Sequence, residues 1–139
     1  MLYYISNIPK NRISFDLLDE VVAFGYEYLG IDDNLELEIS FVGDFEKHQT
    51  GDSDINEEDG IAEININNRL TRKEVIATIF HELVHIKQIL KKELVIGEGF
   101  EPSTWNGKTY ADNYELLPWE EEAFRLENEM MRLFYVDIQ

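Results

Sequence analysis

The chain has 139 residues, of which 44% are hydrophobic, and its 12 basic and 29 acidic side chains give a net charge of −17. This length is sufficient for one domain with a hydrophobic core, so we expect a single domain over residues 1–139. The strong negative charge argues against nucleic acid or an anionic membrane surface as a partner.

Three absences restrict the function and location further. The sequence contains no cysteine, so any metal site has to use histidine, aspartate or glutamate. No apolar stretch approaches the roughly 20 residues of a membrane-spanning helix. The N-terminus lacks the basic start and the longer apolar run of a signal peptide. These features predict a cytoplasmic protein with no membrane partner.

The N-terminal half reads as strands around one amphipathic helix. Residues 2–5 are a candidate strand. Ser14 is a suitable N-cap for a helix that ends at Gly30, because apolar residues recur between them at helical spacing. Residues 35–41 and 62–67 alternate apolar and polar side chains, which predicts two strands with one buried face each.

The segment between these two strands, residues 43–60, is rich in Asp, Glu, Asn and Gly. This composition predicts a long polar loop or hairpin connection. His48 lies inside it. As a metal ligand it would have to fold back from this segment, so a solvated surface histidine is the favoured interpretation.

A second helix is predicted to begin at Thr71, because Thr71 and Glu74 fit a capping box. The apolar residues over 75–90 cover a broad surface of this helix, so we expect it to be buried near the centre of the domain. Gly97 and Gly99 mark its far boundary.

The C-terminal part is expected to hold a short hairpin and a last helix. Residues 105–110 read as a turn or hairpin. Helical spacing of apolar residues returns from Pro118, which suits a first-turn position, to Phe134. Together the elements predict an α+β fold with a short antiparallel or mixed sheet, a central helix and a C-terminal helix.

The central helix contains His81-Glu82-Leu83-Val84-His85. Residues four apart lie on the same helical face, so both imidazoles can reach one tetrahedral Zn²⁺. Glu82 lies about 100° round the helix, where it can act on a zinc-bound water as general base. Such a match occurs by chance in well under about one sequence in a hundred of this length. The competing interpretation is a pair of core histidines satisfied by hydrogen bonds.

A catalytic zinc usually has three protein ligands and a water, so two histidines are not sufficient. No histidine follows His85, and the expected third ligand is therefore a carboxylate from another helix. Glu120, Glu121 and Glu122 are adjacent candidates near the start of the last helix. The competing interpretation is that the first turn of a helix favours carboxylates without any metal.

With this motif and these downstream glutamates, the chain resembles the gluzincin group of zinc peptidases and small phage-type and bacterial metallopeptidases. The resemblance spans residues 71–134 and is specific only at the two-histidine motif. It implies a zincin-like fold whose third ligand is a Glu followed three positions later by a small residue. Glu120 is followed by Ala123 at this spacing and is therefore the first choice. Glu121 ranks second, because a bulky residue follows it at i+3.

The resemblance also implies an activity and a partner. A metal-activated water would hydrolyse peptide bonds of a peptide or protein substrate, with Glu82 as general base. Residues 62–67 occupy the place of the edge strand that binds substrate by backbone pairing in gluzincins. Tyr110 and Tyr114 are the candidates for stabilising the oxyanion, and Trp105 is a candidate for lining the cleft; packing in the core or at the surface is the alternative for each.

The main alternative function is a catalytically weak or inactive metallopeptidase-like protein that binds or regulates a partner. Glu82 favours retained chemistry, because a structural zinc site does not need this carboxylate and normally has a fourth protein ligand. An acidic decoy for a basic site on another protein is suggested only by the charge of −17. Such a decoy would not need the histidines. The patterns predict no particular oligomeric state.

Overall fold

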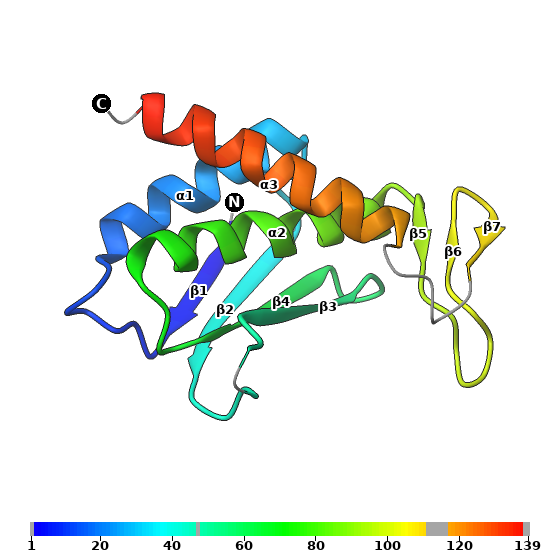
Figure 1. Cartoon of the computed structure of the whole chain (residues 1–139), viewed down its shortest axis with the longest axis horizontal. Coiled ribbons are helices and arrows are strands. Elements are labelled where there is room, and N and C mark those ends of the chain that lie inside the picture. The colour runs from blue at the N-terminus through cyan, green and yellow to red at the C-terminus, as the bar shows by residue number, and fades with distance from the viewer. Residues whose placement is uncertain (1, 47, 111–116, 138–139) are drawn as a thin grey trace.

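The structure, a computed structural model, describes residues 2–46, 48–110 and 117–137. They form a small α+β domain in which all three helices lie on one side of a four-stranded sheet, as Figure 1 shows. A smaller sheet stands at one end of the domain. The elements are β1 (Tyr3–Ser6), α1 (Phe15–Leu29), β2 (Glu36–Val42), β3 (Gly51–Asn56), β4 (Ile61–Asn67), α2 (Arg72–Leu90), β5 (Leu94–Val95), β6 (Thr104–Trp105), β7 (Lys108–Thr109) and α3 (Pro118–Asp137).

The larger sheet is mixed, which agrees with the predicted fold class. Its strand order is β1-β2-β4-β3, with β1, β2 and β4 parallel and β3 antiparallel to β4. The predicted alternation is confirmed in the two central strands, whose buried residues face the helices. These residues are Leu37, Ile39 and Phe41 in β2, and Ala62, Ile64 and Ile66 in β4. The opposite face of the sheet is polar and is not covered by a helix (Figure 1).

Strand β3 corrects two expectations. It lies within residues 43–60, which were expected to be a polar loop or hairpin connection, and the Gly, Asp and Asn in it disfavour strand formation. The segment nevertheless forms a strand because it pairs with β4 along its whole length, and this pairing satisfies its backbone hydrogen-bonding groups. Because β3 flanks β4, the strand over 61–67 is not the edge strand. The free edge beside α2 belongs to β3.

The predicted helix boundaries are confirmed where caps define them. The Ser14 hydroxyl accepts a hydrogen bond from the backbone of the first turn of α1, and Gly30 ends this helix at φ 66°. Thr71 and Glu74 form the reciprocal capping box of α2. This helix ends at Leu90, before the glycines at 97 and 99, because the chain turns there into β5.

Helix α2 occupies the centre of the domain, as predicted, and packs against α1, α3 and the sheet. Gly25 allows the close approach of α1, because a Cβ atom there would lie 2.5 Å from Leu83 Cδ1. The rings of Phe24, Phe80 and Phe134 pack together, with centroids 5.4–5.7 Å apart, and join all three helices. The segment from His81 to His85 therefore lies on the helix that packs against both other helices and the sheet.

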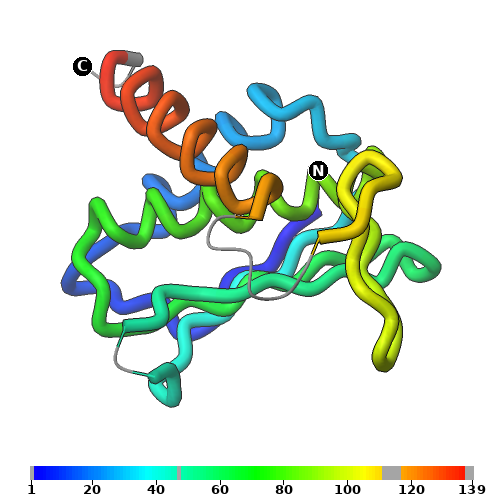
Figure 2. The backbone as a smooth tube through the Cα atoms, turned by 45° about the vertical axis from the view of Figure 1, so that its right-hand side comes forward, coloured from blue at the N-terminus to red at the C-terminus, as the bar shows by residue number. Residues whose placement is uncertain are grey.

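The predicted hairpin at 105–110 is also present. Strands β6 and β7 are joined by Asn106 and Gly107, both at positive φ, which is the backbone that a tight two-residue hairpin requires. Figure 2 shows this small sheet beyond the C-terminal end of α2. Among the described residues, no helix is both long and apolar enough to span a membrane.

Candidate metal centre

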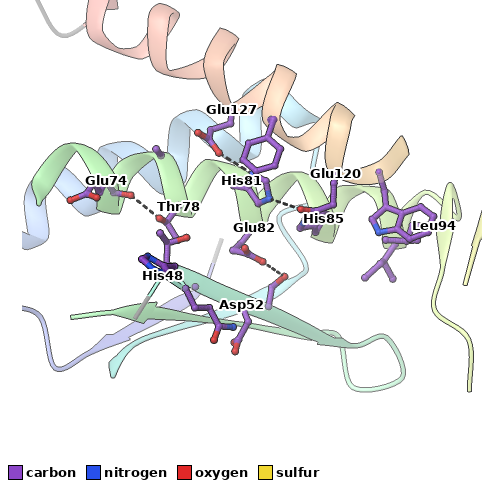
Figure 3. Close-up of a pocket in the computed structure, with 18 of the residues that line it drawn as sticks. His48, Asp52, Glu74, Thr78, His81, Glu82, His85, Leu94, Glu120 and Glu127 are labelled. Carbon is purple, nitrogen blue, oxygen red and sulfur yellow. Dashed lines mark hydrogen bonds and ion pairs between the residues drawn. The ribbon is translucent and has the colours of Figure 1, made fainter. Parts of the chain in front are cut away.

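Helices α2 and α3 bring His81, His85 and Glu120 together (Figure 3). The three ligand atoms all lie within 4.8 Å of one another. Glu120 Oε1 lies 2.5 Å from His85 Nε2, and Glu120 Oε2 lies 3.6 Å from His81 Nε2. Neighbouring ligand atoms of a tetrahedral zinc are about 3.4 Å apart. The distances from the Glu120 carboxylate oxygens to the two imidazole nitrogens are therefore similar to those between ligands of one metal ion.

The choice among the adjacent glutamates follows from how α3 lies on α2. Glu120 points to the two histidines, whereas Glu121 is exposed and does not belong to the group. Ala123, one turn after Glu120, is completely buried. Its small side chain leaves room for α3 to lie against α2. The spacing of Glu120 and Ala123 thus corresponds to a real helix contact in this structure.

The two imidazoles are oriented by acceptors on their other nitrogen. His81 Nδ1 lies 2.9 Å from Glu127 Oε1, and His85 Nδ1 lies 2.9 Å from Gln88 Oε1. Because carboxylate and amide oxygens only accept, each ring donates from Nδ1, and Nε2 offers its lone pair once its own proton has been lost. Both Nε2 atoms face Glu120. The donor chemistry therefore fits a bound metal ion.

Gln88 is completely buried, and its amide orientation follows from its partners. Its Nε2 donates to the carbonyl of Trp119 at 3.0 Å and to Glu122 at 3.2 Å, which leaves the amide oxygen for His85. Gln88 thus links the second histidine of α2 to the first turn of α3, where Glu120 lies.

Glu127 and Gln88 were not predicted as site residues from the sequence. Each carries a recognisable signal. Gln88 is a polar residue on the buried surface of α2, three positions after His85, and Glu127 follows Glu120 at i+7 on the same face of α3. Spacing of this kind is common in helices, so the signals gain meaning only once the two helices are known to touch.

Charge couples the three candidate ligands. Burial lowers the pKa of His81, but its hydrogen bonds with Glu120 and Glu127 outweigh this effect and raise the pKa to about 9. The pKa of His85 is also raised, because hydrogen bonds with Glu120 and Gln88 outweigh burial. In return, hydrogen bonds from the two histidines hold the pKa of Glu120 well below its usual range. Metal binding at neutral pH must therefore displace a proton from His81.

Glu82 lies on a different side of α2 from the histidines, as predicted from helical geometry. It is buried, with 7% of its surface exposed, and its Oε1 accepts a hydrogen bond of 2.7 Å from the Ser53 hydroxyl on β3 (Figure 3). Sequence analysis did not identify Ser53, because it lies in the segment expected to be a loop. The carboxylate thus faces the edge strand.

A cavity of about 630 Å³ lies over these groups. Strand β3 and the residues before it form one wall, and the first turns of α3 form the other. Helix α2 forms the floor, and His81, Glu82 and His85 are among the residues that line it. The candidate metal centre therefore opens into a cleft large enough for part of a peptide.

The remaining candidates fall in different places. His48 is exposed and lines the cleft, but it does not belong to the metal-binding group. Trp119 lines the cleft, whereas Trp105 pairs with β5. Tyr110 packs against Trp119, with ring centroids 6.1 Å apart, and is not among the described residues that line the cleft. Tyr114 lies outside the described residues.

Comparisons of the chain with protein-family models, with curated proteins and with solved structures give no match. The support for a function lies in the geometry and chemistry of the site itself.

Proposed function

We propose that the protein is a zinc-dependent peptidase with a zincin-like fold of the gluzincin type. His81, His85 and Glu120 hold the metal, and Glu82 is the general base. The observation that carries the proposal is the convergence of two imidazole Nε2 atoms and one carboxylate beside a buried second carboxylate, inside a cleft.

The donor set favours catalytic zinc over a structural site. Two imidazoles and one carboxylate are a ligand set of catalytic zinc enzymes, and structural zinc sites have four protein ligands. Within the described ranges the group contains only these three residues. A fourth position is therefore available for water or substrate.

The chemistry assigned to the protein side chains follows from their positions. Zinc held in this site supplies a Lewis acid that lowers the pKa of water and polarises a carbonyl. Glu82 accepts the proton of the attacking water and returns it to the leaving amine. The Ser53 hydroxyl engages one oxygen of Glu82 and so fixes the direction of the other. Tyr110 and Tyr114 remain our candidates for stabilising the oxyanion.

The free edge of β3 is suited to an extended substrate. Thr50 O accepts from Asn67 N across the β3–β4 ladder. In an antiparallel pair only every second residue directs its backbone N–H and C=O groups to the partner strand. The backbone groups of Gly51, Ser53 and Ile55 therefore point away from β4, to the free edge. A peptide that adds to this edge gains main-chain hydrogen bonds beside Glu82. A peptide or protein is therefore the proposed substrate class.

The first experiment measures zinc per chain in the native protein and in three variants. His81→Ala and Glu120→Gln should lose stoichiometric zinc, whereas Glu121→Gln, the matched control on the adjacent exposed residue, should retain it. The absence of stoichiometric zinc from the native protein would overturn the proposal. Loss of zinc from Glu121→Gln but not from Glu120→Gln would overturn the ligand assignment.

The second experiment assays hydrolysis of a mixed peptide library by the zinc-loaded protein. Glu82→Gln should keep the metal and lose turnover by about 10²-fold or more, because it removes the proton acceptor. Zinc binding without any cleavage by the native protein would favour the alternative, a metallopeptidase-like binding or regulatory protein.

A further inference from the structure

The cleft has a direction that two contacts define. A Cβ atom on Gly51 would lie 2.7 Å from Thr78 Cγ2, so the start of β3 lies beside Thr78. Two residues later, Ser53 is hydrogen-bonded to Glu82. Strand β3 and helix α2 therefore run along the cleft in the same direction, and each position on β3 corresponds to a position on α2.

The end of the cleft beyond His85 is apolar. Ile89 lies one turn further along α2, Trp119 precedes Glu120, and Leu94 and Ile96 come from the segment after α2. Figure 3 shows Leu94 at this end, beyond His85. Leu94 is 3% exposed, whereas Ile96 is 57% exposed. Four large apolar side chains from three parts of the chain thus surround one end of the cavity.

The other end, beyond His81, is polar and acidic. Figure 3 places Thr78, Glu74 and His48 there, with Glu127 above them. The cavity lining contains carboxylates but no lysine or arginine among the residues that the structure describes. This end therefore disfavours an acidic substrate residue and attracts a basic one.

The edge strand relates these two ends to the direction of a substrate. Antiparallel pairing is slightly more stable than parallel pairing, so we expect a peptide added to β3 to run opposite to it. Its N-terminal part then lies at the end of β3 near Ile89 and Leu94. Its C-terminal part lies at the start of β3 near Gly51 and Thr78.

We infer that the preferred substrate carries a large apolar residue on the N-terminal side of the scissile bond and a basic residue on its C-terminal side. Ile96, Leu94, Ile89 and Trp119 form the apolar subsite. This inference rests on the proposed peptidase function, and it adds the substrate class and the orientation of the chain in the cleft.

The test uses two peptides of equal length that differ only in the order of the two residues at the central bond. One carries leucine before and lysine after the central bond, and the other carries lysine before and leucine after it. The zinc-loaded protein should cleave the first peptide with a kcat/KM about tenfold or more above the second, which is the range of discrimination by one apolar pocket. Equal rates, or preference for the reversed peptide, would overturn the inference.

Two neighbouring exposed residues provide matched variants. Ile96→Asp places a charge in the apolar subsite and should reduce kcat/KM for the first peptide about tenfold, with zinc content unchanged. Val95→Asp alters a residue that is also half exposed but does not line the cavity, and it should have no such effect. An equal loss in both variants would contradict the assignment of the subsite.

A binding measurement separates this inference from the proposed activity. The zinc-loaded Glu82→Gln protein should bind the first peptide about tenfold more tightly than the reversed peptide in calorimetry. Turnover by the native protein with equal binding and equal cleavage of both peptides would overturn the inference alone. Selective binding without turnover would overturn the peptidase function while the subsite assignment stands.

Discussion

On the α2–α3 side of the cleft the candidate ligand atoms belong to side chains held by hydrogen-bonded partners, whereas β3 on the other side is a strand with a free edge. His81 Nδ1 is hydrogen-bonded to Glu127, and His85 Nδ1 is hydrogen-bonded to the completely buried Gln88. Ser53, by contrast, lies on a strand that is paired on one side only. Under the proposed function, this difference corresponds to a division of tasks in which one side fixes the metal geometry and the other binds the substrate chain.

The largest expected effect is on the side that fixes the metal. His85→Ala removes one of three ligands, so zinc affinity should fall by well over about 100-fold, beyond the loss typical of an outer-sphere partner. Competition with a chromophoric chelator measures this change. Unchanged zinc affinity would show that His85 is not a metal ligand, and it would contradict the proposed difference between the two sides of the cleft.

A smaller effect is expected from the partner of His81. Glu127→Ala leaves all three ligands in place but removes the acceptor of His81 Nδ1–H, so zinc affinity should fall about 10- to 100-fold. The control is Glu121→Ala, which removes an exposed carboxylate from the same helix. If both variants lose affinity equally, the effect reflects general charge and not ring orientation.

On the β3 side the expected effect concerns turnover and not metal binding. Ser53→Ala removes the hydrogen bond to Glu82, and kcat should fall about tenfold while zinc affinity and KM stay near the native values. Measuring zinc content together with kcat and KM sharpens the comparison. A parallel loss of zinc would show that the two sides are not independent.

The smallest expected effect is the pH dependence of stability in the metal-free protein. The pKa of His81 is raised from 6.5 to about 9 by its carboxylate partners, so the folded state binds this proton more tightly than the unfolded state. The resulting stabilisation is fully present below pH 6.5 and is lost as the pH rises through about 9. Urea unfolding in the presence of a chelator should therefore show a lower free energy of unfolding at pH 9 than at pH 6.

His81→Ala should reduce this pH dependence, and the native protein loaded with zinc should not show it. The metal needs deprotonated imidazoles, so zinc binding strengthens over the same pH range. A metal-free protein that becomes more stable between pH 6 and pH 9 would contradict the protonated histidine cluster.

The parts of the fold that were predictable depend on neighbours in the sequence. The capping box at Thr71 and Glu74, the Ser14 cap and the alternation in β2 follow from residues a few positions apart. Strand β3 was not predictable in this way. Its Gly, Asp and Asn residues disfavour a strand, and it exists because β4 offers an unpaired backbone edge.

The same distinction applies to the candidate metal centre. By itself, the sequence determined that His81 and His85 share a helical face with Glu82 between them, because these relations follow from the pitch of one helix. It narrowed the third carboxylate to a run of three. The resemblance to gluzincins favoured Glu120 among them, and the packing of α3 on α2 places Glu120 beside the histidines and adds Glu127 and Gln88 as their partners.

The contacts around the proposed substrate cleft were likewise not predictable from the sequence. Ser53 reaches Glu82 across 29 positions of sequence, and the apolar end of the cleft combines residues from α2, the segment after it and α3. Helical periodicity and capping are local and can be read from spacing. Contacts between separate elements depend on how these elements pack in three dimensions, and this packing is not encoded in local spacing.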